Sequence, residues 1–119
     1  MSPNAREGQV DYIEFPATDT GALRRFYTAA FGWRFEDYGP NYTSFSDGRL
    51  AGGFQSSGED RPSRPLVVVF AADLEGARKR VIQCGGHISR EIFAFPGGRR
   101  FHFKDPDVNE LAVWSDAKR

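Results

Sequence analysis

The chain has 119 residues, with eleven Phe, four Tyr and two Trp but only two His and one Cys. This length is typical of one compact domain, and the aromatic residues can fill its core without a disulfide or a structural metal. One cysteine excludes an intramolecular disulfide, and two histidines exclude a three-histidine metal site. Sixteen basic and sixteen acidic residues give a net charge of zero. This balance argues against a dedicated nucleic-acid binder and against a polybasic membrane module.

The first half of the chain is predicted to form a strand, a helix and three further strands. Residues 10–16 alternate apolar and polar side chains with period two, as a strand does. The helix that follows is capped by Thr18 or Asp19 and ended by Gly32. Its inner stripe is predicted to hold Leu23, Phe26, Tyr27 and Ala30. Three short strands are predicted next, over residues 33–37, 42–46 and 49–55. Asp47-Gly48 joins the last two as a two-residue hairpin.

The same order of elements is predicted to begin again after a polar segment, residues 56–65, which is read as a linker or mobile loop. Residues 66–70 form a strand that is apolar on both faces, and Asp73 caps a second helix that Gly85-Gly86 ends. The inner stripe of this helix holds Leu74, Ala77, Val81 and Cys84. Three strands follow, over residues 87–95, 99–104 and 110–114.

The two halves repeat one architecture at an offset of 54 residues. We therefore expect a single domain over residues 1–119. Its module one covers about residues 8–55, the linker residues 56–65 and module two residues 66–116.

No targeting or membrane-spanning segment is expected. Residues 1–9 are polar and lack the apolar core of a signal peptide. The longest apolar run, residues 66–72, is far shorter than the roughly 20 residues of a spanning helix. Together with the lone Cys84, these features predict a cytoplasmic protein.

Three stretches together resemble a known family: residues 10–16, the segment Arg25-Phe-Tyr-Thr-Ala-Ala-Phe-Gly-Trp33, and Asp105-Pro-Asp-Val-Asn109 leading into Trp114. They resemble the vicinal oxygen chelate superfamily, which includes glyoxalase I, bleomycin and fosfomycin resistance proteins and extradiol dioxygenases. The resemblance implies an α+β fold of two βαβββ modules that form a curved mixed sheet with helices on its convex face. It also implies a homodimer. The family has Gly where this chain has Val108, and a β-branched residue is poor at positive φ, so a differently built turn is expected.

Strand parity and the resemblance together divide the strand side chains between two faces. Those expected to face the helices are Ile13, Phe15, Val67, Val69, Leu111 and Val113. Those expected to line the concave face are Tyr12, Glu14, Leu66, Val68, Phe70, Ala112 and Trp114.

The resemblance implies metal-ligand positions that hold no usable ligand in this chain. Enzymes of the family chelate a divalent metal that polarises substrate oxygens. The matching positions are Tyr12, Leu66 and Ala112, and residues 50–54 offer no acid or imidazole for a further ligand. Leu66 and Ala112 have no donor atom, and Tyr12 could bind only as a phenolate, whose reference pKa is about 10. We therefore expect no metal and no other cofactor.

Glu14 and His102 are the candidate acid–base residues. Glu14 is either a polar hook or general base in a ligand pocket, or a carboxylate paired with an arginine such as Arg49 or Arg100. His102 is either a ligand-contacting imidazole or a histidine packed at a dimer interface. A noncognate metal site made by Tyr12, Glu14 and His102 is a further alternative.

These observations leave three hypotheses of function. The first is a metal-independent protein that binds a small apolar or aromatic molecule. Its ligand-binding residues are expected to be Tyr12, Leu66, Val68, Phe70, Ala112 and Trp114. The second is a lyase or isomerase that uses Glu14 or His102, or a metal-dependent enzyme with the noncognate site. The third is an interaction module whose cavity is filled by side chains. A small molecule is the expected partner, and nucleic acid and membrane are not.

Overall fold

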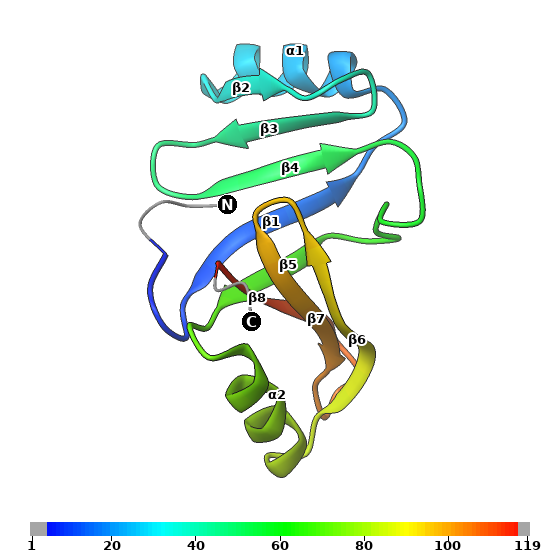
Figure 1. Cartoon of the computed structure of the whole chain (residues 1–119). Coiled ribbons are helices and arrows are strands. Elements are labelled where there is room, and N and C mark those ends of the chain that lie inside the picture. Colours follow the sequence, from blue (N-terminus) through cyan, green and yellow to red (C-terminus); the bar gives the residue numbers. More distant parts are fainter. Residues whose placement is uncertain (1–4, 117–119) are drawn as a thin grey trace. The chain divides into compact units, whose positions relative to one another are not determined.

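The computed structural model describes residues 5–116 and divides into two compact units (Figure 1). Among the described residues, the first unit comprises residues 12–66 and the second comprises residues 5–11 and 67–116. Each unit has one helix and a four-stranded mixed sheet, so the expected α+β class with two βαβββ modules is confirmed.

The first unit carries helix α1 on one face of its sheet. Its elements are β1 (Val10–Pro16), of which residues 12–16 lie in this unit, α1 (Thr20–Phe31), β2 (Arg34–Asp37), β3 (Tyr42–Ser46) and β4 (Ala51–Gln55). The strand order is β2-β3-β4-β1, with β1 parallel to β4 and the other neighbours antiparallel. The Asp19 carboxylate accepts a hydrogen bond from the Ala22 amide, and Gly32 ends α1 at φ 72°. Both helix ends are therefore set by the residues that the sequence indicates.

The core of the first unit is built from stacked aromatic rings. Trp33 lies 4.6 Å from Tyr27 and 4.5 Å from Phe45, measured between ring centroids. Phe15 stacks on Phe54 at 5.2 Å. Because Phe15 packs in this helix-side core, the side chains that alternate with it on β1 point to the opposite face of the sheet.

The predicted inner stripe of α1 is only partly correct. Leu23 and Tyr27 pack against the core, whereas Phe26 is 58% exposed and Ala30 is exposed. Successive helix residues are rotated by about 100°, so turning Tyr27 onto the sheet carries Phe26 away from it.

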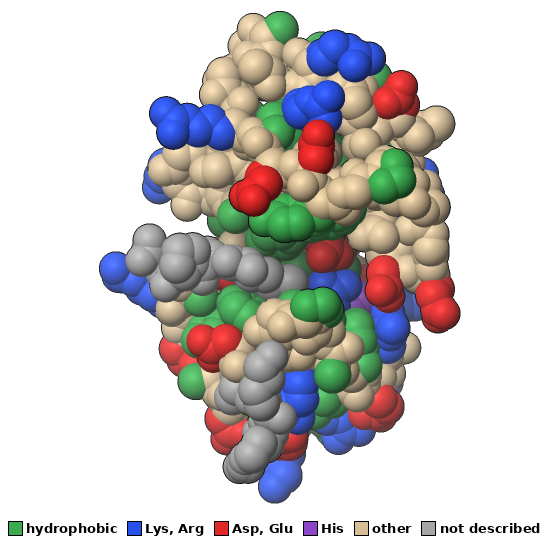
Figure 2. All heavy atoms as spheres, turned by 45° about the horizontal axis from the view of Figure 1, so that its top comes forward, with side chains coloured by type: hydrophobic (Ala, Val, Ile, Leu, Met, Phe, Trp, Pro, Cys, Tyr) green, Lys and Arg blue, Asp and Glu red, His purple; other side chains and the backbone are tan. Residues whose placement is uncertain are grey.

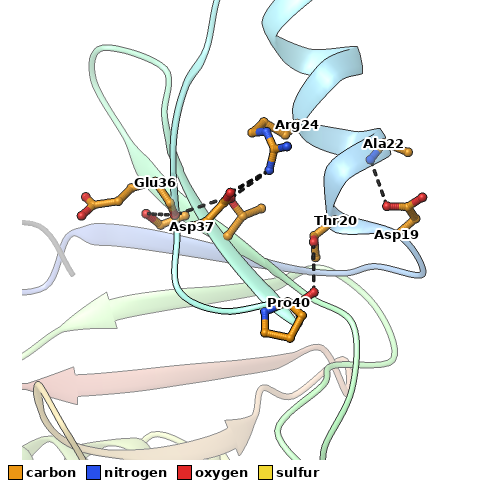
Figure 3. A network of polar contacts seen from close by, with 9 residues as sticks. Asp19, Thr20, Ala22, Arg24, Glu36, Asp37 and Pro40 are labelled. Atoms are coloured by element: carbon orange, nitrogen blue, oxygen red, sulfur yellow. Dashed lines mark hydrogen bonds and ion pairs between the residues drawn. The ribbon is translucent and has the colours of Figure 1, made fainter.

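Polar contacts tie α1 to the strand that follows it (Figure 3). Arg24 Nη1 donates to both carboxylate oxygens of Asp37, at 3.0 and 2.9 Å, and the Thr20 hydroxyl donates to the Pro40 carbonyl.

The connection from β3 to β4 is longer than the expected two residues. The Asp47 carboxylate accepts hydrogen bonds from the Arg49 and Leu50 amides, so β4 begins only at residue 51.

The second unit repeats the order of the first. Its elements are β5 (Leu66–Phe70), of which residues 67–70 lie in this unit, α2 (Leu74–Gln83), β6 (His87–Phe95), β7 (Gly98–Lys104) and β8 (Glu110–Ser115). The strand order is β5-β8-β7-β6, with β5 parallel to β8 and the other neighbours antiparallel.

Helix α2 packs on one face of this second sheet. The Asp73 carboxylate caps the helix by accepting a hydrogen bond from the Gly76 amide. The buried side chains beneath the helix are Leu74, Ala77, Phe101 and Val113, with Val81 packed against them. The expectation that Cys84 continues this stripe is wrong, because α2 ends at Gln83 and Cys84 is the exposed cap residue.

The first described residues of the chain belong to the second unit, whereas the sequence places residues 8–11 in module one. The Gly8 amide donates to the Phe70 carbonyl at 2.8 Å, and the Phe70 amide donates to the Gln9 carbonyl at 3.1 Å. The Glu7 carboxylate accepts a hydrogen bond from the Ala72 amide at 2.8 Å. Backbone pairing with the end of β5 thus holds this segment against the second unit.

Charges are intermixed on the molecular face drawn in Figure 2, where Lys and Arg side chains lie among Asp and Glu side chains. Within residues 5–116, no helix is long and apolar enough to span a membrane.

Candidate functional site

The strands of the second unit bring four of the predicted ligand-binding residues onto one face, away from α2. Phe101 and Val113 contact the helix side, so their neighbours along each strand point to the other face. Register places Val68 and His102 on either side of Ala112, and Phe70 and Arg100 on either side of Trp114. This face therefore collects Val68, Phe70, Arg100, His102, Ala112 and Trp114.

Aromatic rings and cations gather on this surface. Phe70 meets Trp114 edge-to-face at 5.3 Å, and Phe95 lies 6.3 Å from Trp114. The Arg90 guanidinium lies over the Phe93 ring, 3.6 Å from the ring centroid. The guanidinium carbon of Arg100 lies 5.5 Å from the ring centroid of Phe93 and 5.9 Å from that of Phe95. The ring centroids of His102 and Phe93 are 5.8 Å apart. We call this set, Phe70, Arg90, Phe93, Phe95, Arg100, His102 and Trp114, the aromatic face.

The margin of the aromatic face is reachable from solvent, whereas its centre is buried. Phe93, Phe95 and Arg90 on β6 are half-buried. Arg100 and Trp114 are each only 5% exposed. The part of the aromatic face nearest to solvent is therefore formed by β6.

A buried carboxylate fixes the indole of Trp114. Trp114 Nε1 donates a hydrogen bond of 2.9 Å to Asp11 Oδ2, and Asp11 is 5% exposed. This hydrogen bond between two buried side chains holds the indole in one orientation. No local sequence pattern predicts this role of Asp11, which lies 103 residues away from Trp114.

His102 lies beside a carboxylate at the edge of the aromatic face. Its Nδ1 is 3.6 Å from Glu110 Oε2, and the same oxygen accepts a hydrogen bond from the Ser89 hydroxyl at 2.8 Å. At 3.6 Å this contact is electrostatic and longer than a hydrogen bond. Glu110 is therefore a candidate for orienting the His102 imidazole.

The helix-free face of the first unit holds a different cluster. The hydroxyls of Tyr12 and Tyr42 are hydrogen-bonded to each other, and we call these two residues the tyrosine pair. Both phenols lie directly over Gly53 of β4, where an added Cβ would be 2.0 Å from Tyr42 Oη and 2.9 Å from Tyr12 Oη. Glu14 is two residues beyond Tyr12 on β1 and is paired in register with Gly53.

Burial raises the pKa of Tyr12 far above its usual value, and the neighbouring Tyr42 and Glu14 raise it further. Tyr12 is therefore a neutral phenol throughout the physiological range. A phenolate at this position would carry the full cost of desolvation.

The eight predicted site residues are divided between the two units. Tyr12, Glu14 and Leu66 lie in the first unit. His102, Val68, Phe70, Ala112 and Trp114 lie in the second.

The residues at the family's ligand positions do not fit a divalent metal. Leu66 and Ala112 are buried hydrocarbons, and Tyr12 is a protonated phenol bonded to Tyr42. Gly53, within the fourth-strand segment, has no side chain. Over residues 5–116, no group of three or more His, Cys, Asp or Glu side chains is arranged to hold a metal ion.

Comparisons with known proteins agree with the fold. A family model described as Glyoxalase/Bleomycin resistance protein/Dioxygenase superfamily matches residues 9–113. Methylmalonyl-CoA epimerase from Mycobacterium tuberculosis is 11% identical with a TM-score of 0.75, over 98% of this chain and 93% of that one. A glyoxalase/bleomycin resistance protein/dioxygenase superfamily member from Vibrio splendidus 12B01 is 14% identical with a TM-score of 0.66, over 92% and 99%.

A third similar structure is the Mn(II)-bound glyoxalase from Novosphingobium aromaticivorans, which is 22% identical with a TM-score of 0.68. The similarity covers 97% of this chain but only 42% of that one. No curated protein sequence matches the chain. At these identities the structures show a shared fold, and the activity has to be argued from the residues themselves.

Proposed function

Because the chain belongs to the glyoxalase/bleomycin resistance protein/dioxygenase superfamily, we propose that it binds a small apolar or aromatic molecule on its aromatic face, without the family's metal. The observation that carries the proposal is the gathering of aromatic rings and cations on that face, where half-buried Phe95 lies beside Trp114 and half-buried Phe93 beside Arg90 and Arg100. Ligand sites are mostly apolar and aromatic, with a few placed polar groups. Offset-stacked or edge-to-face ring contacts add about 0.5–1.5 kcal/mol each beyond the buried area.

The polar groups of this face define how a ligand would be held. The two guanidinium groups lie over ring faces and the Trp114 indole is fixed by Asp11. Preorganised side chains reduce the entropy that is lost on binding. A rigid, flat ligand would gain most from such a surface.

A metal takes no part in the proposed binding, because the residues at the family's ligand positions do not fit one. Leu66 and Ala112 offer no donor atom, and Tyr12 is a neutral phenol. Binding or sequestering a molecule through apolar contacts requires no Lewis acid.

The binding proposal is tested with Trp114 as the reporter. The chain has only two tryptophans, and Trp33 lies in the core of the first unit, so Trp33→Phe leaves Trp114 as the single tryptophan, which is excited selectively at about 295 nm. Small aromatic molecules are first screened by thermal shift, since a ligand that binds only the folded protein raises its melting temperature. Each hit is then titrated against the fluorescence of Trp33→Phe. We expect saturable quenching or a spectral shift.

A matched pair of variants locates the site. Phe93→Leu removes a ring of the aromatic face, whereas Phe26→Leu removes an exposed ring of α1. We expect Phe93→Leu to weaken binding about three- to tenfold and Phe26→Leu to leave it unchanged. Equal effects of the two variants, or hits that do not perturb Trp114, would contradict the proposal.

A second candidate function is a lyase or isomerase with His102 as the acid–base group. It is favoured by one observation, the approach of Glu110 to His102 Nδ1. The test is turnover of the screened hits by the protein and by its His102→Gln, Glu110→Gln and Glu14→Gln variants. Loss of turnover with retained binding in His102→Gln would favour this enzyme over simple binding, and loss in Glu14→Gln alone would assign the role to Glu14.

The homodimer and the cytoplasmic location remain proposals. Light scattering of the purified protein tests the first, and a tagged chain located by fractionation tests the second. A protein that is monomeric at micromolar concentration would contradict the proposed homodimer.

A further inference from the structure

We infer that Asp11 sets the class of ligand that the aromatic face takes, namely an aromatic molecule with no hydrogen-bond acceptor where it lies against Trp114. The inference rests on the proposed function and deepens it, because it concerns the same site. The residues that carry it all belong to the second unit. Asp11 thereby becomes a specificity-determining residue that acts on the ligand through the indole of Trp114.

The first step is the placement of Asp11. The Gly8 amide donates to the Phe70 carbonyl at 2.8 Å, and the Phe70 amide donates to the Gln9 carbonyl at 3.1 Å. These bonds tie the segment before Asp11 to the residue whose ring meets Trp114 at 5.3 Å. Asp11 is itself only 5% exposed. Its carboxyl group therefore comes from paired, buried backbone and has little freedom to leave the indole.

The second step is a count of hydrogen-bond donors. An indole has one polar hydrogen, on Nε1, and no acceptor. Trp114 Nε1 donates this hydrogen to Asp11 Oδ2 at 2.9 Å. Because this bond uses the single donor, Trp114 offers a ligand only the surface of its ring.

The third step concerns a ligand that carries an acceptor. A ring nitrogen or a carbonyl placed against Trp114 would lose its hydrogen bond to water and gain none from the indole. It could take the indole N–H only by depriving the buried Asp11 oxygen of this bond, which is unfavourable as well. Both outcomes weaken binding, whereas a hydrocarbon ring avoids them.

The rings next to Trp114 indicate the same class of ligand. Phe70 lies edge-to-face with Trp114, and Phe95 lies 6.3 Å from it. Neither phenylalanine has a polar side-chain atom. The shortest contact between a cation and a ring on this face lies elsewhere, between Arg90 and Phe93 at 3.6 Å. The Trp114 end of the aromatic face is therefore its hydrocarbon end.

The test compares two fused-ring probes of the same shape. One is naphthalene, and the other is the centrosymmetric naphthyridine whose nitrogens lie next to the ring fusion. This naphthyridine has an acceptor in each ring, so an acceptor accompanies whichever ring lies against Trp114. Both are titrated by NMR on the indole N–H signal of Trp114, in Trp33→Phe protein, where it is the single indole signal.

Two variants of Asp11 are measured in the same background. Asp11→Leu keeps the branched shape of the side chain but has no acceptor. Asp11→Asn keeps an acceptor oxygen for the indole and is the matched control. The readout is the ratio of the two affinities, because a general loosening of the site affects both probes alike.

We expect naphthalene to bind at least about tenfold more tightly than the naphthyridine when Asp11 is present. Asp11→Leu releases the indole N–H, so it should lower this ratio about three- to tenfold, and Asp11→Asn should retain it. In Asp11→Leu the naphthyridine should shift the indole N–H signal downfield, as a new acceptor does, and naphthalene should not.

Three results would overturn the inference. The first is an affinity ratio that Asp11→Leu leaves unchanged. The second is a naphthyridine that shifts the Trp114 N–H signal downfield while Asp11 is present, since the donor would then be available to a ligand. The third is naphthalene that does not bind up to its solubility limit.

The second result needs no variant of Asp11, so it keeps the inference falsifiable if circular dichroism shows that Asp11→Leu is unfolded. In that case, weaker binding of the naphthyridine with an unshifted N–H signal supports the inference. Other hits of the thermal-shift screen that perturb Trp114 would still support the proposed function after any of the three overturning results. The ligand class and the binding site therefore fail separately.

Discussion

Substituting Gly53 tests the geometry of the tyrosine pair most sharply. The alanine Cβ would lie 2.0 Å from Tyr42 Oη, 2.4 Å from Tyr42 Cζ and 2.9 Å from Tyr12 Oη. These overlaps exceed what a few tenths of an ångström of movement relieves, so Tyr42 must leave its position and the hydrogen bond between the phenols is lost. Overpacking costs about 1–3 kcal/mol and the lost hydrogen bond about 1 kcal/mol. Gly53→Ala should therefore lower the free energy of unfolding by about 2–4 kcal/mol.

A double-mutant cycle with Tyr42→Ala isolates this cause. Removing the Tyr42 ring removes the two closest contacts of the new Cβ, so Gly53→Ala should cost about 2 kcal/mol less in that background. Gly21→Ala in α1 is the matched control, because its Cβ meets only side-chain atoms at 3.4 Å or more. It should stabilise the protein by about 0.5–1 kcal/mol through helix propensity. Urea unfolding followed by circular dichroism measures the free energies of the four proteins of the cycle and of the Gly21→Ala control. A Gly53→Ala cost that is the same with and without Tyr42 would refute the reasoning.

Three further predictions follow from backbone strain and from titrating groups. Val108 is 67% exposed at φ 68°, so Val108→Gly should raise the free energy of unfolding by about 0.5–1 kcal/mol in urea melts, and a loss of stability would contradict this. Folding raises the pKa of Tyr12 above its unfolded-state value of about 10. Above pH 10 the free energy of unfolding should therefore fall by up to about 1.4 kcal/mol per pH unit, and Tyr12→Phe should remove this part of the pH dependence. Hydrogen bonds from the Asn109 side chain, the Asn109 amide and the Asp107 amide lower the pKa of Asp105. The stability that Asp105 contributes is therefore present above its unfolded-state pKa of about 3.9 and is lost as the pH falls through its lower folded value. In urea melts, Asp105→Ala should destabilise the protein at pH 7 and progressively less as the pH is lowered below about 3.9, and a cost that does not depend on pH would contradict this.

Local signals in the sequence predicted the elements well where one residue controls one helix end. Asp19 and Asp73 cap their helices through their own carboxylates, and Gly32 adopts the left-handed conformation that ends α1. The prediction was wrong where a side chain reorganises the backbone beyond its neighbour. Asp47 binds two amides and replaces the expected two-residue hairpin by a longer connection.

The turn at Val108 shows the limit of a residue-type rule. A β-branched residue is unfavourable at positive φ, which predicts a differently built turn. The structure instead keeps the left-handed conformation at Val108, at φ 68°. Three hydrogen bonds to the Asp105 carboxylate surround this residue and offset its strain.

Parity along strands predicted part of the candidate site. The alternation in β5 and β8 placed Phe70 and Trp114 on one face, where the structure brings their rings into contact. It could not place Phe93, because β6 has register shifts between Ile88 and Arg90 and between Arg90 and Phe93. A bulge changes the face of every later residue, so alternation counted from before the bulge assigns those residues to the wrong face.

Long-range polar pairs were beyond any local pattern. Asp11 meets Trp114 across 103 residues and Tyr12 meets Tyr42 across 30. Neither contact has a periodicity or a motif, since each depends on which strands become neighbours in the folded sheet. Gly53 carried the only local signal, a glycine inside a predicted strand, which often marks a close approach of another group.

The most direct test of the account is a titration of the Trp33→Phe protein with an aromatic hit from the thermal-shift screen, followed by Trp114 fluorescence. The titration is run once in excess EDTA and once in excess MnCl2. The proposed binding on the aromatic face predicts saturation with the same dissociation constant in both. Binding that appears only with Mn2+, or that disappears in EDTA, would contradict a metal-independent small-molecule site in this chain.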